Sequence, residues 1–390
     1  MTVAPAERLN NIPPYAFATI ARRVRELRAQ GHDVIRIDMG SPDMPPAPEV
    51  VQALHTSALD DSHHGYAGFA GIPELRQAFA DYYARRFEVG LNAETEVLPL
   101  IGSKEGIVNL QLALVDPGDV VLVSDPGYPA YDKGTVLAGG EPYAVPLLAE
   151  NGFLPVLEDV PAEIVDRAKL MWINYPNNPT GAVASLGDLQ RIVDFCREHD
   201  IMLAHDNPYA DLTFDGLKPP SLLEAEGARD IAVEFNSLSK TYNMAGWRVG
   251  VCVGNADIIA ALLRVKSNID SGLFRAIQDA AITALNTVSE DWIAERNVAY
   301  QARRDIIVEA LPSIGLSGSA PRAGLYVWAR VEDGDDVAYA GEALQHAHVS
   351  MAPGSVYGAA GAGFVRMSLI VPEDRMREAM SRLEAWYASR

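Results

Sequence analysis

The sequence predicts an α/β protein with a mostly parallel sheet in a large domain and a smaller α+β domain beside it. Two observations carry this prediction. Short apolar runs alternate with amphipathic helical patterns through the middle of the chain, as in open sheets with helices on both faces. From about residue 286 the pattern changes to long helices, a short alternating segment and a helical C-terminus. We expect an N-terminal arm that joins the small domain over 1–46, the large domain over 47–285 and the small domain over 286–390.

Local sequence patterns predict three helices and one linker between the domains. An amphipathic helix is expected near residues 16–30, with Ile20, Val24 and Leu27 on one face. The proline-rich segment SPDMPPAPEV follows, and its extended backbone is expected to cross between the domains. Residues 73–88 are predicted to be helical, and residues 185–200 form a further helix that opens with a capping serine.

The strands of the large domain are predicted from apolar runs of the kind that parallel sheets bury on both faces. These runs lie at residues 119–125, 168–174, 200–206, 230–236 and 248–254. Four polar or glycine-bearing clusters stand at the ends of such runs: SDPGY, NYPNNPTG, HDNPY and NSLSK. Ligands of open α/β sheets bind beyond the carboxyl ends of the strands, so a site is expected where these clusters meet.

Composition excludes several classes of function. The net charge of -20 argues against nucleic acid and against anionic membrane surfaces, which are bound by concentrated Lys and Arg. No run of about 18 apolar residues occurs, so no membrane span is predicted. The N-terminal residues lack the apolar core of a signal peptide, and Cys196 and Cys252 lack metal-ligand spacing. We expect a cytoplasmic protein without a bound metal.

Two glycine-rich segments are candidate phosphate sites. GAAGAG at 358–363 mimics a dinucleotide fingerprint but lacks the strand–turn–helix context, and no P-loop sequence is present. GSKEG at 102–106 precedes a helical pattern, so its backbone N–H groups could hold an anion, although an ordinary helix cap would look the same.

The polar clusters together form a chemical set. Lys240 can form a Schiff base with an aldehyde, Asp206 can keep a ring nitrogen protonated, and Tyr128 can stack on a flat ring. Taken alone, these residues would be read as a surface lysine, a strand-end cap and a core tyrosine. Four further residues can surround a phosphate: Ser103, Lys104, Ser237 and Arg248. Pyridoxal 5'-phosphate (PLP) requires this combination.

The motifs also resemble a known family. GSKEG, DPGYP, NYPNNPTG, HDNPYADL, SLSKTYNMAGWRVG and APGSVYGAAGAGFVRMSL are similar to segments of the class I/II aminotransferases of PLP fold type I, in that family's order. The resemblance extends from about residue 36 to the end and implies a transaminase that uses PLP, an amino acid and a 2-oxo acid. It also implies a homodimer, because Tyr66 matches a tyrosine that reaches the phosphate of the neighbouring subunit.

The resemblance assigns a role to each matching residue. Lys240 would hold the cofactor covalently and then move the substrate proton, Asp206 would pair with the pyridine nitrogen, and Tyr128 would stack on the ring. Asn178 and Tyr209 would hydrogen-bond the phenolic oxygen. The phosphate would lie among Ser103, Lys104 (through backbone amides), Ser237 and Arg248.

For the substrate, the resemblance implies that Arg366 clamps the α-carboxylate with help from Gly40 and Asn178. One departure stands in the cofactor segment. The family usually has D-x-A-Y where this chain has Asp206-Asn207-Pro208-Tyr209. The spacing is kept, so we expect the cofactor contact to be kept as well.

The substrate is a finer question. Segments such as IGSKEGI, LNNIPPYAF and VKSNIDSGLFRAIQ are similar to the LL-diaminopimelate aminotransferase branch, which implies a long donor, with 2-oxoglutarate as the expected acceptor. Four residues are candidates for meeting its distal group: Tyr15, Lys266, Asn268 and Arg275. The same branch leaves aspartate, alanine, methionine or aromatic donors open. A PLP-dependent C–S lyase of the same fold and a non-catalytic PLP-binding regulator are the rival classes, although no basic DNA-binding segment is left over for the second.

Overall fold

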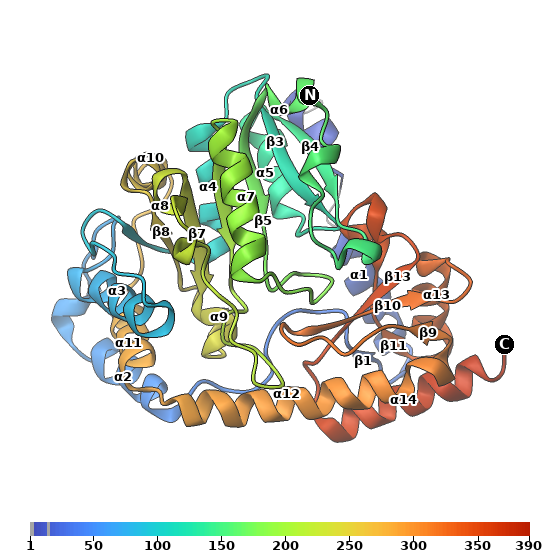
Figure 1. Ribbon diagram of the computed structural model, residues 1–390. Coiled ribbons are helices and arrows are strands. Elements are labelled where there is room, and N and C mark those ends of the chain that lie inside the picture. The colour runs from blue at the N-terminus through green and yellow to red at the C-terminus, as the bar shows by residue number, and fades with distance from the viewer. Residues whose placement is uncertain (1–3, 14–15) are drawn as a thin grey trace.

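The computed structural model describes residues 4–13 and 16–390. Its centre is a seven-stranded sheet with the strand order β2-β8-β7-β6-β5-β3-β4 (Figure 1). The strands are β2 Val97–Leu100, β3 Val120–Asp125, β4 Glu141–Pro146, β5 Ala168–Ile173, β6 Met202–Asp206, β7 Ala232–Ser237 and β8 Gly250–Gly254. The mostly parallel sheet is therefore confirmed.

One strand differs from the prediction. The run at 248–254 was grouped with runs typical of parallel sheets, but β8 pairs antiparallel with both β7 and β2. All five residues of β8 are buried. Helices cover both faces of the sheet, so burial makes the run apolar whichever way the strand points, and the pattern carries no information on direction.

Two layers of helices cover the sheet on opposite faces. Apolar residues of β3 alternate between them, because successive side chains of a strand point to opposite faces. Leu122 packs in the layer with α7, whereas Val121 and Val123 pack in the layer with α4 and α10. The helices of this part of the chain are α2 Pro48–Ala58, α3 Pro73–Phe87, α4 Ser103–Leu114, α5 Ala130–Ala138, α6 Ala162–Val165, α7 Leu186–Glu198, α8 Ala228–Ile231, α9 Leu238–Thr241, α10 Ala256–Lys266 and α11 Arg275–Thr287.

Helix α7 begins where the sequence predicted. The Ser185 hydroxyl accepts a hydrogen bond from the backbone N–H of Asp188, and the Asp188 carboxylate accepts one from the N–H of Ser185. This reciprocal capping box satisfies two backbone donors that the helix itself leaves unpaired. Leu189, Ile192, Val193 and Cys196 form the buried face of α7, as expected.

A second, four-stranded antiparallel sheet has the order β12-β13-β10-β9. Its strands are β9 Leu316–Ser317, β10 Tyr326–Val331, β12 Ala352–Pro353 and β13 Phe364–Ser368. The helices near it are α12 Glu290–Ala310, α13 Asp336–Glu342 and α14 Glu373–Tyr387. In Figure 1, α12 runs along the base of the molecule, from below the large sheet to α14.

The N-terminal segment lies beside this second sheet and belongs to a separate two-stranded sheet. Strand β1 Ile35–Arg36 pairs with β11 Val349–Ser350, and Ile35 and Ile37 are buried in the same apolar core as α12 and α14. Helix α1 Ala16–Ala29 precedes β1 and buries Val24 and Leu27. The domain limits at residues 46 and 285 stay predictions.

Short helical turns complete the chain. They are η1 Glu7–Asn11, η2 Asp61–His64, η3 Ala149–Asn151, η4 Leu157–Asp159, η5 Leu222–Glu224, η6 Ala245–Trp247, η7 Leu311–Ile314, η8 Ala343–Ala347, η9 Gly354–Tyr357 and η10 Ala359–Gly361. Within residues 4–13 and 16–390, no helix is long and apolar enough to cross a membrane.

The GAAGAG segment contributes to a contact between the two sheets. The backbone N–H groups of Ala359 and Ala360 donate to the Asp125 carboxylate at the end of β3, at 3.1 and 3.0 Å. A Cβ at Gly358 would overlap Asp125, and the φ of Gly358 is 135°, so both space and backbone require glycine here. No strand–turn–helix unit forms, in agreement with the sequence analysis.

Candidate active site

A cavity of about 530 Å³ lies beyond the carboxyl ends of β5, β6 and β7 and also reaches the second sheet. This is where ligands of open α/β sheets bind. Its lining includes eleven residues that the sequence singled out: Gly40, Ser103, Lys104, Tyr128, Asn178, Asp206, Tyr209, Ser237, Lys240, Arg248 and Arg366. Residues from seven separate segments of the chain therefore meet in one place.

Asp206 ends β6 and is 5% exposed. Tyr131 donates a hydrogen bond to its Oδ2 at 2.9 Å, and Asn174 donates to its backbone carbonyl at 2.6 Å. Its Oδ1 is buried and has no hydrogen-bond partner among the described residues. Burial raises the pKa of Asp206 to about 6. A buried carboxylate oxygen without a donor is costly, so this atom fits a ligand N–H such as a protonated ring nitrogen.

Lys240 lies on α9, the single turn that follows β7 and is capped by the Ser237 hydroxyl. Its Nζ donates to the backbone carbonyl of Gly40. Arg296 fixes the base of this turn by donating to the Lys240 carbonyl at 2.8 Å. Burial lowers the pKa of Lys240, and the nearby guanidinium of Arg366 lowers it further. A depressed pKa makes the neutral, nucleophilic amine more accessible.

An anion cup is formed at the start of α4, which begins at Ser103. Gly102 precedes it with φ 74°, and a Cβ there would overlap the Arg248 guanidinium. Gly250 also permits close approach, because a Cβ there would lie 2.6 Å from the Ser103 nitrogen. Arg248 itself adopts φ 58°, an uncommon conformation for a residue with a side chain. Backbone N–H groups at a helix start, with a guanidinium beside them, suit a phosphate.

Arg366 lies on β13 and is 4% exposed. Its Nη1 donates to Asn178 Oδ1 at 2.8 Å and its Nη2 to the Asp38 carbonyl at 2.7 Å. The guanidinium carbon lies 3.9 Å from the centre of the Tyr326 ring. Both hydrogen-bond partners are neutral groups, and its Nε lacks a partner among the described residues. A buried cation in this state fits a substrate carboxylate.

The tyrosines that line the cavity include Tyr128, Tyr209 and Tyr326. Tyr128 lines it, with the Lys104 amine 5.7 Å from its ring centre. The Tyr209 hydroxyl donates to the Tyr326 hydroxyl at 3.1 Å. Although burial alone would raise the pKa of Tyr326, the adjacent Arg366 and Lys240 charges lower it. Tyr326 also explains Gly40, because a Cβ at residue 40 would overlap its hydroxyl.

The remaining candidates lie elsewhere. Tyr15 falls outside the described residues. Tyr66 is 91% exposed and does not line the cavity of its own chain.

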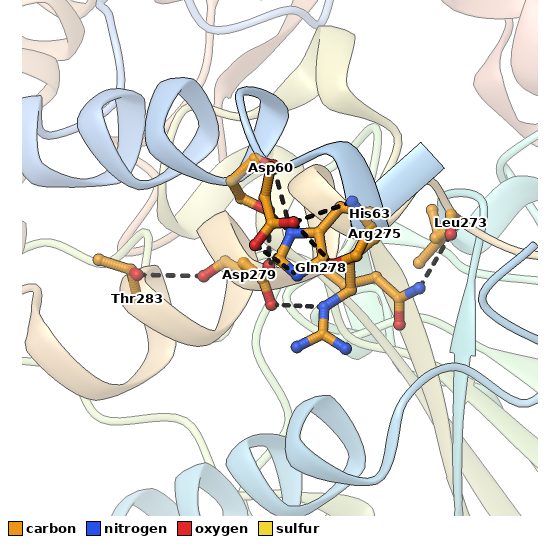
Figure 2. Close-up of polar contacts among 9 residues, drawn as sticks. Asp60, His63, Leu273, Arg275, Gln278, Asp279 and Thr283 are labelled. Atoms are coloured by element: carbon orange, nitrogen blue, oxygen red, sulfur yellow. Dashed lines mark hydrogen bonds and ion pairs between the residues drawn. The ribbon is translucent and has the colours of Figure 1, made fainter. Parts of the chain in front are cut away.

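Of the candidates for the distal group, none of the three described ones lines the cavity. Lys266 is 1% exposed and pairs with Glu105 and Asp270. Asn268 donates to the Arg264 carbonyl. Figure 2 shows Arg275 beside Asp279 on α11, with its Nε 2.9 Å from the carboxylate. Ion pairs within the chain hold the two cations, and the roles of these residues toward the substrate stay predictions.

Sequence reasoning missed four residues of the site. Tyr326 and Asp38 line the cavity, Tyr131 holds Asp206, and Asn174 orients Asn178 by accepting a hydrogen bond from its backbone N–H at 2.7 Å. A signal existed for Asn174, which opens the quoted NYPNNPTG cluster. Tyr326 falls in an alternating strand whose pattern indicates burial and not what the side chain faces.

These observations fit PLP. The donor-free Asp206 oxygen matches a pyridinium N–H, the start of α4 with Arg248 matches a phosphate, and the Lys240 amine lies in the same cavity. Fold and site together define a PLP-dependent enzyme of fold type I.

The comparisons with known proteins specify the class. Residues 32–383 match the family described as Aminotransferase class I and II. LL-diaminopimelate aminotransferases from Desulforudis audaxviator and Gloeobacter violaceus are each 50% identical, over 98% and 97% of both chains. Among solved structures, substrate-bound BacF from Bacillus subtilis is 36% identical with a TM-score of 0.94, covering 99% of this chain and 98% of that one. An aspartate aminotransferase from Thermus thermophilus with maleate is 31% identical with a TM-score of 0.92, covering 99% and 100%.

The chain belongs to the class I and II aminotransferase family and is a PLP-dependent transaminase. The expected family, fold type and cofactor are confirmed. The structural relatives include proteins named for aspartate, aromatic and N-succinyldiaminopimelate substrates, so the fold alone does not select a donor.

Proposed function

We propose that this enzyme transfers an amino group from LL-diaminopimelate to 2-oxoglutarate. The observation that carries the proposal is the set of full-length relatives of that name at 47–50% identity. The solved structures with other donors in their titles are 28–35% identical. Aspartate, alanine, methionine and aromatic amino acids are the alternative donors.

In the proposed site, Lys240 is the covalent anchor and the base that takes the proton from the substrate Cα. Arg366 clamps the α-carboxylate, with Asn178 and the Gly40 backbone beside it. When bound, PLP supplies the electron sink that stabilises the charge left on Cα. Asp206 would maintain that sink by holding its carboxylate against the protonated ring nitrogen.

The other contacts orient the cofactor. Ser103, Lys104, Ser237 and Arg248 hold the phosphate, and Tyr128 stacks on the ring. Asn178 and Tyr209 hydrogen-bond the phenolic oxygen. The common lining of one cavity by all of these residues supports the assignment.

The proposed enzyme is a homodimer in which Tyr66 reaches the phosphate of the other subunit. Its 91% exposure in the single chain supports this, because an aromatic side chain is seldom left so bare without a partner. Sedimentation of the holoenzyme gives its mass, and Tyr66→Phe is expected to weaken PLP binding if the tyrosine contacts the phosphate.

A cytoplasmic location is supported by two cysteines that are both free and buried, as in reducing compartments.

A donor panel with 2-oxoglutarate tests the function. LL-diaminopimelate is expected to give the largest kcat/KM, with glutamate formed in equal amount to donor consumed. A larger kcat/KM for aspartate, alanine, methionine or an aromatic donor would replace the proposed substrate and leave the transaminase assignment intact.

The C–S lyase is tested by omitting the oxo acid. A transaminase converts at most one cofactor equivalent of donor and stops, whereas a lyase releases pyruvate and ammonia continuously from cystine or cystathionine. Continuous release at a rate exceeding transamination would contradict the proposal.

A further inference from the structure

Strand β1 and the two residues after it present two charged side chains to the active-site cavity. Ile35 and Ile37 point into the apolar core, and the alternation of a strand sends the residues between and after them to the other face. Those residues are Arg36 and Asp38, and both line the cavity. Arg36 is thus a cation at the wall of the cavity, outside the contacts proposed for the cofactor and the α-carboxylate.

Arg36 and Asp38 form a bidentate ion pair. The Arg36 Nε donates to Asp38 Oδ1 at 3.0 Å, and its Nη2 donates to Oδ2 at 2.6 Å. The Asp38 side chain is fully buried, whereas that of Arg36 is 23% exposed. A guanidinium has five N–H donors. Two of them hold Asp38, so three remain for a ligand while the side chain stays fixed.

Asp38 also connects Arg36 to Arg366. Its side chain holds the first guanidinium, and its backbone carbonyl accepts from Nη2 of the second at 2.7 Å. One residue therefore sets the separation between two guanidinium groups at the wall of one cavity. Two cations at a fixed separation suit a substrate with a carboxylate at each end.

The adjoining wall leaves room for a long substrate. Ala18 and Ala21 of α1 line the same cavity as Arg36, and their small side chains project little into it. Phe17 of α1 lies near Arg366, with its ring centre 5.6 Å from the guanidinium carbon. This wall thus offers apolar surface between two positively charged groups.

We propose that Arg36 binds the distal carboxylate of the substrate, with Asp38 as the positioning residue that holds Arg36 and Arg366 at a set distance. The inference rests on the proposed function, because it names the residue that binds the distal group of the proposed donor. It replaces Lys266 and Arg275, whose side chains are held away from the cavity.

A competing explanation is that Arg36 serves only to neutralise Asp38. A buried carboxylate next to Arg366 would otherwise weaken the attraction of any substrate carboxylate. In that case loss of Arg36 harms all donors alike, and removing the Asp38 charge as well restores them. The two explanations therefore predict opposite results for a double variant.

The test uses the holoenzyme and two matched donors, 2-aminopimelate and 2-aminoheptanoate, which differ in their distal carboxylate. Arg36→Gln is expected to lower the ratio of their kcat/KM values about 10- to 100-fold, mainly through KM. Arg36→Lys is expected to retain part of the preference, and Arg36→Gln with Asp38→Asn is expected not to restore it. Arg22→Gln is the matched control, since it removes an exposed arginine that pairs with Glu26 outside the cavity.

Equilibrium binding gives a readout that does not depend on turnover. Pimelate and heptanoate are titrated into the holoenzyme and followed by the cofactor absorbance or by calorimetry. Tighter binding of pimelate is expected for the wild type and for Arg22→Gln, and Arg36→Gln is expected to remove that difference.

The proposal is overturned if the wild type binds pimelate no more tightly than heptanoate, if Arg36→Gln keeps the ratio, or if the double variant restores it. Failure of the proposed function looks different. LL-diaminopimelate is then a poor donor of the wild type, while the dependence of dicarboxylate binding on Arg36 stays measurable.

Discussion

The cavity has two halves that are built in different ways. The sheet half consists of residues at the ends of β5, β6 and β7 and at the start of α4. Its members come in short local groups, such as Asp206 with Tyr209 and Ser237 with Lys240. The lobe half consists of Gly40, Tyr326 and Arg366. Tyr326 and Arg366 lie on paired strands of the second sheet, and Gly40 is hundreds of residues from both. A local group leaves its spacing in the sequence, whereas the meeting of Gly40 with Tyr326 leaves none.

The two halves also differ in what they lack. Among the residues that the structure describes, a buried oxygen of Asp206 in the sheet half has no donor, and a buried guanidinium in the lobe half has only neutral acceptors. The first deficiency suits a cofactor and the second suits a substrate. Variants of the two halves should therefore separate cofactor effects from substrate effects.

The largest effect is expected for Lys240→Ala in the sheet half. Loss of the anchor and base should lower kcat by about 10⁴-fold or more. Single-turnover kinetics and the cofactor absorbance would measure it, and the melting temperature of the variant would serve as the folding control. Full turnover by this variant would refute the assignment of Lys240.

Arg366→Gln should have the next largest effect, this time in the lobe half. Removing a buried guanidinium that binds a carboxylate is expected to lower kcat/KM about 10²- to 10³-fold. The cofactor spectrum should stay that of the wild type, because the sheet half is intact. If the spectrum changes as much as the kinetics, the two halves are not separable in the way described.

Asp206→Asn tests the electrostatics of the sheet half without cofactor. Burial raises the pKa of Asp206 from 3.8 to about 6, so between these values the folded state holds a proton that the unfolded state releases. The stability of the cofactor-free protein should therefore fall as pH rises through this window, by at most about 3 kcal/mol.

The asparagine variant should lack this fall. In the cofactor-free form it should match the wild type near pH 4 and exceed it near pH 8, as judged by denaturant unfolding. With PLP present the order should reverse, because the charge then has its partner. Equal pH profiles for the two cofactor-free proteins would contradict the expectation.

Tyr326→Phe should have the smallest effect. It removes one neutral hydrogen bond to Tyr209 but keeps the ring that lies against Arg366. A neutral hydrogen bond contributes roughly 1 kcal/mol, so kcat/KM should fall by only about 5-fold. Steady-state kinetics would measure it. A loss as large as that of Arg366→Gln would give the hydroxyl a direct part in the reaction.

The sheet half could be predicted from sequence because its residues stand directly after buried strands. Asp206 and Lys240 follow apolar runs, and the carboxyl ends of neighbouring parallel strands meet at one edge. The direction of β8 could not be predicted, since burial on both faces makes parallel and antiparallel strands equally apolar. Tyr326 and Asp38 lie in strand patterns that report burial alone.

The sequence around Lys266 contains a pattern that predicts burial of this lysine. It follows Ile258, Ile259 and Leu262 at helical spacing, and all three lie on the buried face of α10. A lysine at the next position of that face is expected to be buried and paired, as it is with Glu105 and Asp270. Its ammonium group is therefore paired within the fold and is not available to a substrate.

The contact between Asp125 and the GAAGAG segment bears on how the enzyme can open. The backbone N–H groups of Ala359 and Ala360 donate to the Asp125 carboxylate, so the GAAGAG segment binds an anion from its own chain. Charge-assisted hydrogen bonds of this kind are about twice as strong as neutral ones. A movement of the second lobe relative to the large sheet would therefore pivot at this contact or break its two hydrogen bonds.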